Sequence, residues 1–280
     1  MNENRPLVSV IIPAKDSAPT LERCIKSVRG QTYSNTEIMI VDGQSTDATV
    51  SIASALADFV ISMSGERSEA RNRGARESRG GYLLFLDADM VLSRGVVEEC
   101  IDAAAEDNSA VIIPEIAVGA GFWSRCRSLE KECYRGDDLI EAARFFPRRF
   151  FSELGGYDEG LGPAGEDWDL TLRARKVGFR IVRVQSSIMH DEGELTLAGT
   201  MRKKRYYGKY LWRFHKRHGR DARRRLVPWR RAYFSNVKKL CENPLPAAGL
   251  AFLKVCESFA AGIGWIEGRA MTRSPQIRDE

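Results

Sequence analysis

The amino-acid sequence predicts an α/β fold with a mainly parallel sheet, and three observations carry this prediction. Short apolar runs alternate with helical patterns from Leu7 to Ile113. The first run, Leu7–Ile12, is continuous and rich in β-branched residues, which is typical of a strand buried on both faces. With 280 residues, 43% hydrophobic and 29% charged, the chain can bury a large core, which excludes a disordered or fibrous protein. Repeated strand–helix units of this size favour a parallel sheet with right-handed crossovers.

The expected elements follow one another in order. The first strand ends at Pro13, and a helix follows with Ser17 as its N-cap and Gly30 as its stop. Its apolar residues recur at helical spacing: Leu21, Cys24, Ile25 and Val28. The next expected strands are Ile38–Val41, Phe59–Ser62, Tyr82–Leu86 and Val111–Ile113, and the next expected helices are Asp47–Leu56, Glu69–Ser78 and Val96–Ala105. In such sheets ligands bind at the carboxyl ends of the strands, so the residues that follow each strand are the first candidates for function.

Charge divides the chain into two parts. Residues 1–199 carry 23 Lys and Arg against 32 Asp and Glu, a net charge of −9, whereas residues 200–280 carry 20 against 6, a net charge of +14. We therefore predict an acidic domain at 1–199 and a basic helical extension at 200–280 that contacts an anionic surface. The six cysteines contain no Cys-x-x-Cys pair, which indicates reduced, intracellular thiols, and the start of the chain shows no signal peptide.

Carboxylates follow three of the predicted strands. Asp16 follows the first strand, Asp42 ends the second, and Asp87-Ala88-Asp89 follows the fourth. Any one of them alone has a structural alternative, since acids near helix starts serve as caps. Two carboxylates two residues apart repel each other unless a cation neutralises them, and Mg²⁺ or Mn²⁺ shared with a phosphate suits such ligands. Neither a G-x-G-x-x-G fingerprint nor a phosphate-binding G-x-x-x-x-G-K-[ST] loop follows a strand, which argues against a dinucleotide-dependent dehydrogenase.

A series of motifs occurs in order along the chain. They are Val8-Ser9-Val10-Ile11-Ile12-Pro13, Val41-Asp42-Gly43-Gln44-Ser45-Thr46-Asp47, Ala70-Arg71-Asn72-x-Gly74, Asp87-Ala88-Asp89, Gly155-Gly156-Tyr157-Asp158 and Gly165-Glu166-Asp167-Trp168-Asp169-Leu170. Over about residues 7–192 this series resembles the inverting glycosyltransferases of family 2, which have the GT-A fold. The resemblance implies a nucleotide-diphospho-sugar donor, a divalent cation (Mn²⁺ or Mg²⁺) and transfer with inversion at the anomeric carbon.

The resemblance also implies roles for individual residues. Asp16 and Asp42 match acids of the nucleotide pocket, and Arg71 matches a basic residue of the donor region. Asp87 and Asp89 match the motif that holds the ribose and the metal–pyrophosphate. His190 falls where related enzymes place a histidine after the last core strand, often a third metal ligand, although a satisfied histidine at a strand end is the equal alternative. The donor-binding part is expected at about residues 1–115.

Asp167 matches the general base that deprotonates the acceptor hydroxyl. Inversion by direct displacement needs one carboxylate on the acceptor side and a cation on the leaving diphosphate. Glu166, Trp168 and Tyr157 are candidate acceptor contacts within an acceptor-binding part at about residues 116–199. Two departures from the family pattern, Asp42-Gly43 and Lys15-Asp16, lie in the nucleotide pocket and leave the donor base open.

Two other functions remain as alternatives. One is a sugar-nucleotide pyrophosphorylase, although the segment after the first strand lacks the glycine- and lysine-rich loop of those enzymes. The other is a catalytically silent adaptor for a membrane or a nucleic acid, which acts through the basic extension. Within the transferase interpretation, the acceptor is expected to be a lipid-linked glycan or a polyprenyl carrier in the biosynthesis of surface polysaccharide or glycoconjugate.

The basic extension contains an aromatic pattern. Between Arg202 and Arg231 there are 14 Lys or Arg against the single acid Asp221. Tyr206, Tyr210 and Phe214 recur every four residues, which predicts one aromatic helix face with basic flanks that lies on an anionic bilayer at the cytoplasmic side. Nucleic acid is not the expected partner. The structural alternative is a helix whose basic face is simply solvated. Pro244–Ile266 is expected to pack on the domain or dip into the interface without crossing, since Lys254 and Glu257 interrupt it.

Overall fold

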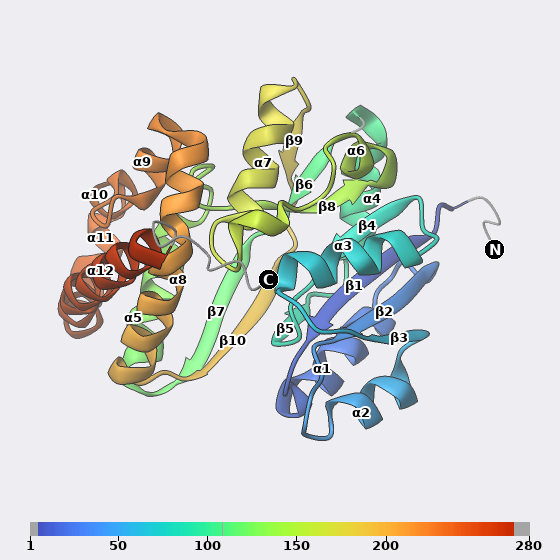
Figure 1. Cartoon of the computed structure of the whole chain (residues 1–280), viewed down its shortest axis with the longest axis horizontal. Helices are drawn as coiled ribbons and strands as arrows, with labels where there is room; N and C mark the ends of the chain where they lie inside the picture. Colours follow the sequence, from blue (N-terminus) through green and yellow to red (C-terminus); the bar gives the residue numbers. More distant parts are fainter. Residues whose placement is uncertain (1–4, 108, 272–280) are drawn as a thin grey trace, which may run out of the picture. The chain divides into compact units, whose positions relative to one another are not determined.

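The computed structural model describes residues 5–107 and 109–271 of the chain (Figure 1). Residues 1–4, at the start of the segment expected to hold no signal peptide, lie outside the described residues. Residues 272–280, at the end of the predicted extension, also lie outside them. The chain divides into two compact units. The first unit comprises Met1–Val118, Arg135–Gly160 and Asp167–Glu192, and the second comprises Gly119–Tyr134, Leu161–Glu166 and Gly193–Glu280. Each unit is built from three segments of the sequence, so the units do not coincide with the predicted boundaries at residues 115 and 199. Those boundaries stay predictions.

The first unit is built on a large sheet. Among the described residues, seven strands form it in the order β3-β2-β1-β4-β8-β6-β9. In that order their bounds are Phe59–Ser62, Thr36–Asp42, Val8–Ala14, Tyr82–Phe85, Ala143–Pro147, Ala110–Ile112 and Ile181–Arg183. The strands β3, β2, β1 and β4 are parallel, and β9 is parallel to β6. The predicted parallel character is therefore confirmed, and β8 is an additional strand that lies antiparallel to β4 and β6.

Helices cover both faces of this sheet because its strands are apolar on both sides. On one face, Val10 and Ile12 of β1 pack with apolar residues of α1, α2 and α4. On the other face, Ile11 packs with residues of α3, α6 and α7. The bounds of these helices are Ala18–Arg29 for α1, Thr49–Leu56 for α2, Arg67–Glu77 for α3, Val96–Asp107 for α4, Arg148–Glu153 for α6 and Glu166–Lys176 for α7, with a 3₁₀ turn at Glu159–Leu161.

The helix α3 lies unusually close to the sheet at Gly74. A Cβ added at this glycine would lie 2.5 Å from Cγ2 of Ile11 and 3.2 Å from Cγ2 of Val41. Only a residue without a side chain fits such an approach. The glycine of the Ala70-Arg71-Asn72-x-Gly74 motif thus seats α3 on β1 and β2. Arg71 and Asn72, one helical turn or less before it, are buried in the same unit.

A smaller sheet completes the strands. Among the described residues it has the order β5-β10-β7, with bounds Met90–Leu92, Ile188–Glu194 and Glu115–Ala120. In the antiparallel pair of β5 and β10, His190 lies opposite Met90. His190 therefore lies inside a strand of the smaller sheet and comes after β9, the last strand of the large sheet along the chain. The pairing sets His190 beside the residue that comes directly after Asp89.

The second unit is helical in its described residues. Its helices are α5 (Gly121–Tyr134), α8 (Leu197–His218), α9 (Arg220–Leu226), α10 (Arg231–Ser235), α11 (Val237–Glu242) and α12 (Pro244–Met271). The helices α8 and α12 pack closely at three glycines. A Cβ at Gly208 would collide with the carbonyl of Ala261, and a Cβ at Gly264 would collide with that of Arg205. Gly268 meets Lys209 in the same way, so one side of α12 is committed to α8.

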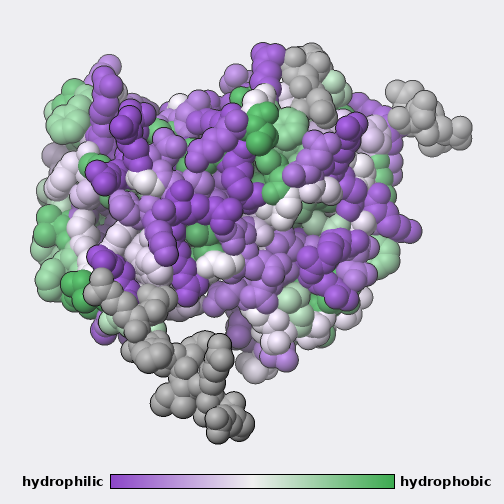
Figure 2. All heavy atoms as spheres, turned by 45° about the horizontal axis from the view of Figure 1, so that its top comes forward, coloured by the Kyte–Doolittle hydropathy of each residue, from purple (hydrophilic) through white to green (hydrophobic). Residues whose placement is uncertain are grey.

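The helix α12 has two contrasting sides. Large apolar side chains are exposed on one of them, and hydrophobic residues gather over α10–α12 at the left edge of Figure 2. By length and composition α12 is the one described helix that could cross a membrane. Buried helices of soluble proteins meet the same criterion. The expectation that the segment does not cross stays a prediction.

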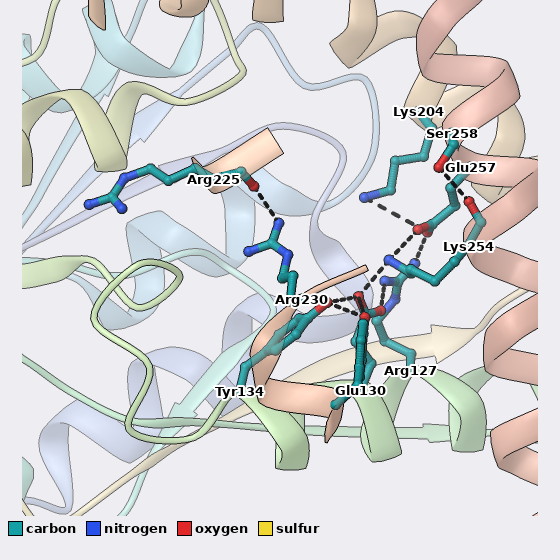
Figure 3. A network of polar contacts seen from close by, with 10 residues as sticks. Arg127, Glu130, Tyr134, Lys204, Arg225, Arg230, Lys254, Glu257 and Ser258 are labelled. Carbon is teal, nitrogen blue, oxygen red and sulfur yellow. Dashed lines mark hydrogen bonds and ion pairs between the residues drawn. The ribbon is translucent and has the colours of Figure 1, made fainter. Parts of the chain in front are cut away.

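The other side of α12 joins a buried cluster of charges (Figure 3). We call Arg127, Glu130, Lys204, Lys254 and Glu257 the buried charge cluster. Nζ of Lys254 lies 2.5 Å from Oε1 of Glu130 and 2.5 Å from Oε2 of Glu257, and Arg127 pairs with both acids. Tyr134 donates to Glu130 at 2.6 Å. Positive and negative groups thus alternate through the interior of this unit.

The predicted aromatic face of α8 is only partly available to a membrane. Phe214 is fully buried, with its ring against Gly165. Tyr210 packs against Gly162, which has a positive φ of 71° and no side chain in the way. Tyr206 is exposed. The prediction that all three rings face a bilayer is therefore wrong for Phe214, because the ring fills the interior of the second unit.

Candidate active site

The first candidate group lies where β1 and β2 end. The carboxylate of Asp16 accepts hydrogen bonds from the backbone N–H and the hydroxyl of Thr46, at 2.8 and 3.1 Å. Asp42 is buried and accepts from the backbone N–H of Ser45, whose hydroxyl in turn accepts from the backbone N–H of Asp16. Asp16 holds a left-handed φ of 45°, a conformation that aspartate tolerates better than most residues. Ser45 thus links the two acids, and their role in a nucleotide pocket stays a prediction.

The second group joins three of the predicted residues through one guanidinium. Arg71 is fully buried, and its Nη2 lies 2.8 Å from Oδ1 of Asp87. Its Nη1 lies 2.8 Å from Oδ1 of Asp167. The structure therefore brings together the acid after β4 and the acid at the start of α7, which are 80 residues apart, through a single side chain of α3. Arg71 is thus an interior residue of α3 and not a solvated one.

Two residues that the sequence analysis missed complete this group. Arg144 on β8 lies 2.7 Å from Oε1 of Glu115 and 3.4 Å from Oδ2 of Asp87. Glu115 is the first residue of β7. A signal for Arg144 was present, since a lone arginine interrupts the buried run Ala143–Pro147. A charge inside a buried strand needs a partner, and that partner marks a polar site.

Ionisation of this group follows from its charges. Burial acts to raise the pKa of Asp87, but Arg71 and Arg144 outweigh it and hold that pKa well below its usual range. Burial acts to lower the pKa of Arg144, and the carboxylates of Glu115 and Asp87 raise it above its ordinary value. Asp87 is therefore a carboxylate and Arg144 a cation at neutral pH.

The candidate metal ligands lie at one edge of this group. Nε2 of His190 is 3.3 Å from Oδ2 of Asp89, and its Nδ1 is 3.3 Å from Oε2 of Glu115. Within residues 5–107 and 109–271, no three His, Cys, Asp or Glu side chains are grouped closely enough to hold a metal ion by themselves. Asp89 Oδ1 is nevertheless a buried oxygen with no hydrogen-bond partner among the described residues. A carboxylate oxygen without a partner, beside an imidazole, fits a divalent cation that takes its other ligands from a bound diphosphate.

The candidate acceptor residues are positioned differently from one another. Tyr157 is buried, and its ring lies 5.0 Å from the Arg71 guanidinium carbon. Its backbone is held by Asn72, which accepts from the Tyr157 N–H at 2.9 Å and donates to its carbonyl at 2.9 Å. The indole of Trp168 donates to the carbonyl of Ile140 at 2.8 Å, and Glu166 is buried. Tyr157 therefore lines the Arg71 group, whereas Trp168 anchors a loop.

The acid two residues after Asp167 has a structural role. Asp169 is fully buried and lies 2.7 Å from Nε of Arg173. Arg173 also donates to the carbonyls of Leu154 and Gly156, at 2.5 and 2.6 Å. Asp169 thus ties α7 to the Gly155-Gly156 turn. Asp167 is part-exposed, at 24% for its side chain, so it is the acid of this pair that solvent or a ligand reaches.

Comparison with known proteins identifies the family of the chain. Residues 9–158 match the family model for glycosyl transferase family 2. The chain is 31% identical over 126 residues to an uncharacterized glycosyltransferase, EpsJ, of Bacillus subtilis, which covers 43% of this chain and 35% of that protein. It is 29% identical over 179 residues to a PGL/p-HBAD biosynthesis glycosyltransferase of Mycobacterium tuberculosis, covering 60% of this chain and 69% of that protein. It is 27% identical to the chondroitin synthase of Escherichia coli over 62% of this chain, which is only 27% of that enzyme's length.

Solved structures share the fold. The mannosyltransferase PcManGT from Pyrobaculum calidifontis, in complex with GDP-Man and Mn²⁺, has a TM-score of 0.57 at 21% identity and covers 98% of this chain and 82% of that chain. S. aureus TarS 1–349, in complex with UDP, has a TM-score of 0.54 at 16% identity and covers 96% and 93% of the two chains. The predicted GT-A fold is confirmed. Because the family model matches more than half of the sequence, with motif residues at the described positions, the chain belongs to glycosyltransferase family 2 and is a glycosyltransferase.

Proposed function

We propose that the protein transfers a sugar from a nucleotide-diphospho-sugar to a hydroxyl or phosphate acceptor, with inversion at the anomeric carbon. The observation that carries this proposal is the position of Asp167. It shares the buried guanidinium of Arg71 with Asp87, at 2.8 Å on each side. An acid that reaches solvent is thereby fixed beside the acid expected to hold the donor, which is the arrangement that direct displacement requires.

The donor site of this proposal follows the strand ends. Asp16 and Asp42, linked through Ser45, hold the nucleoside, and Asp87 holds the ribose side of the diphosphate. The solved neighbours were bound to UDP, UDP-GlcNAc or GDP-Man. Both uridine and guanosine donors therefore belong in a test of this chain.

Asp89 and His190 would hold Mn²⁺ or Mg²⁺ in this proposal, because Asp89 carries the unpartnered oxygen and His190 lies beside it. When bound, the cation neutralises negative charge on the leaving diphosphate. Asp87 is already engaged by Arg71 and Arg144. Its contribution to a metal is therefore smaller than that of Asp89, and its main effect is to orient the two arginines.

The proton of the acceptor hydroxyl passes to Asp167. Oδ1 of this residue accepts from Arg71, so Oδ2 is the atom that takes the proton as the hydroxyl oxygen attacks. Arg71 fixes the direction of the carboxylate, and Tyr157 covers the guanidinium. Positioning of this kind contributes by holding the base near the reacting oxygen before the reaction begins.

We further propose that the acceptor is a lipid-linked glycan or polyprenyl carrier at the cytoplasmic face of the membrane, in surface polysaccharide or glycoconjugate biosynthesis. Two facts support this. Residues 200–280 have a net charge of +14, which favours an anionic surface. The mycobacterial relative is named for PGL/p-HBAD biosynthesis.

A donor panel tests the transferase proposal. The protein is incubated with UDP- and GDP-linked sugars, with Mn²⁺ or Mg²⁺, and release of the nucleoside diphosphate is measured against the Asp167→Asn variant. We expect release from one class of donor, dependent on the cation and greatly reduced in the variant. Release that is equal with and without a chelator would contradict the metal role, and equal release from the variant would contradict the base.

A further inference from the structure

We infer that the outward side of α12 is a membrane-insertion surface, by which the second unit dips into one leaflet of an anionic bilayer. This inference rests on the membrane location proposed above and specifies the surface that makes the contact. It moves that surface from the aromatic side of α8, where Phe214 is buried, to the last helix.

The outward side of α12 is free of charge over most of its length. Between Leu245 and Ile266 every exposed position is uncharged, and the large ones recur at helical spacing: Leu245, Phe252, Val255, Phe259 and Ile266. They are 53–75% exposed. At 1.5 Å per residue this apolar stripe is about 30 Å long. Exposed apolar residues on soluble proteins are usually scattered singly, so a continuous stripe of this length indicates an interaction surface.

The charged residues of α12 face the other way. Lys254 and Glu257 are buried in the charge cluster with Glu130, Arg127 and Lys204 (Figure 3). Gly264 and Gly268 lie against the backbone of α8. The helix therefore packs within its unit mainly through this side, and of the large outward residues Phe252 also stacks on Trp123 of α5, with 6.1 Å between ring centroids. Since only one side is apolar and uncovered, α12 fits a bilayer surface better than a full crossing.

Basic residues accompany this apolar stripe. The neighbouring helices α10 and α11 expose Arg231, Lys238 and Lys239 beside Phe234 and Val237. The helix α9 adds exposed Arg223 and Arg224, and Trp229 follows it, half exposed. Glu242 is the one exposed acid among residues 222–243. Apolar side chains with basic and aromatic flanks match an interface of acyl chains below anionic headgroups.

A second copy of the chain is the competing occupant of this surface. Two copies that met through α12 in a symmetric dimer would bring their basic residues of α10 and α11 toward each other. Like charges in such an arrangement disfavour association, whereas an anionic leaflet neutralises them. Charge complementarity therefore favours the bilayer.

Vesicle flotation of the full chain tests this inference. Vesicles of phosphatidylcholine with equal phosphatidylglycerol are compared with phosphatidylcholine alone. We expect binding to the anionic vesicles, and at least about tenfold weaker partitioning for the double variant Phe252→Glu/Phe259→Glu, since two apolar side chains lose their burial. Val177→Glu, at a residue 63% exposed in the first unit, is the matched control and should bind normally.

A second variant separates charge from apolar contact. Lys238→Glu/Lys239→Glu should weaken binding to anionic vesicles about tenfold or more and change binding to neutral vesicles little. Binding of the Phe252→Glu/Phe259→Glu variant at the wild-type level would overturn the inference. Resistance of the bound wild-type protein to carbonate extraction would also overturn it, because such resistance marks a spanning helix. Light scattering tests the competing occupant. If the wild type does not bind vesicles but forms dimers that Phe252→Glu/Phe259→Glu abolishes, the surface belongs to a second copy and the inference is overturned.

Nucleoside diphosphate release distinguishes this inference from the proposed function. Both double variants should release it from a soluble donor at the wild-type rate, because none of the residues described in the Asp87 group lies on α11 or α12. Vesicle binding without any donor turnover by the wild type would leave the surface intact and contradict the transferase mechanism instead.

Discussion

Two clusters of alternating charge, one in each unit, use the same residue types for different ends. In the first unit Arg71 and Arg144 hold Asp87, Asp167 and Glu115, and His190 joins Asp89 to Glu115. In the second, Arg127 and Lys254 hold Glu130 and Glu257. The first cluster contains buried atoms without a hydrogen-bond partner in the described residues, Asp89 Oδ1 and Arg144 Nη1, whereas none of the side-chain atoms of the second does.

The difference indicates what each cluster is for. Asp89 and Asp167 have side chains 44% and 24% exposed, so a ligand can reach them. Glu130 and Glu257 are almost fully buried, and their oxygens are used by neighbouring cations and by Tyr134. Incomplete pairing with access to solvent suits binding and catalysis, while complete pairing without access serves structure. Substitutions should therefore affect activity in the first cluster and stability in the second.

The largest effect is expected for Asp167→Asn. The amide oxygen can still accept from Arg71, but it cannot take a proton from the acceptor, so transfer should fall by roughly 10²–10⁴-fold. Donor affinity and the urea midpoint should change little. Initial rates measure transfer, titration measures donor affinity, and urea denaturation measures the midpoint. Glu153→Gln, at an exposed acid paired only within its own helix, is the control, and near-normal transfer by Asp167→Asn would move the base elsewhere.

Glu130→Gln should act on stability. It leaves Arg127, Lys204 and Lys254 with Glu257 as the one remaining carboxylate of the buried charge cluster, and this excess of positive charge costs about 3–5 kcal/mol of the free energy of unfolding. Urea denaturation measures this loss, with the exposed acid of the same helix, Glu132→Gln, as control. A loss below about 1 kcal/mol would show that the buried charge cluster is not structural.

Arg144→Lys should weaken the binding of nucleoside diphosphate about tenfold. The planar guanidinium of Arg144 contacts Glu115 and Asp87 at the same time. The lysine ammonium is a single point charge on a shorter side chain, so it cannot hold both carboxylates at these distances. Calorimetric titration with Mn²⁺ present measures the affinity. The exposed Arg149→Lys is the matched control on the next helix. Unchanged affinity in Arg144→Lys would remove this residue from the donor site.

The smallest effect concerns pH. Burial lowers the pKa of Lys204 from 10.5 to about 8, against the raising effect of Glu257. Between about pH 8 and 10.5 the unfolded chain binds this proton and the folded protein does not, so the contribution of Lys204 to the free energy of unfolding rises with pH there. Below pH 8 this contribution is constant. Because about a third of the side chain is exposed, solvent screening keeps the rise below about 1 kcal/mol.

Lys204→Met should remove that rise. Urea denaturation at pH 7 and 9.5 compares it with the wild type and with Lys203→Met, at the exposed neighbouring lysine. An identical pH dependence in Lys204→Met and the wild type would contradict the perturbed ionisation.

The sequence predicted the first half of the sheet well because its strands carry their own signal. Leu7–Ile12 is apolar except for Ser9, Ile38–Val41 is a continuous apolar run, and they appear as β1 and β2. The strands β9 and β10 were missed. Ile181–Arg183 is three residues long and Ile188–Glu194 is half polar, so neither has a periodicity that distinguishes it from a loop. Such strands form because a neighbour offers a free edge, which local sequence does not reveal.

The candidate site was predictable where a motif carried it. Asp42, Arg71, Asp87 and Asp167 lie in recognisable segments, and the structure links the last three. Glu115 and Arg144 belong to no motif. Their importance comes from contacts between β7, β8 and the loop after β4, which depend on the antiparallel insertion of β8. The outward side of α12 was missed for a related reason, since only the packing on α8 shows which side of the helix is left uncovered.

The most direct test of the account is a titration of UDP and GDP into the wild type and Asp89→Asn, each with Mn²⁺ and with a chelator. The account predicts that the wild type binds one of the two nucleotides strongly only with Mn²⁺, and that Asp89→Asn loses this metal-dependent part while its urea midpoint stays unchanged. Equal binding in all four conditions would contradict the assignment of the first cluster as a metal-assisted donor site.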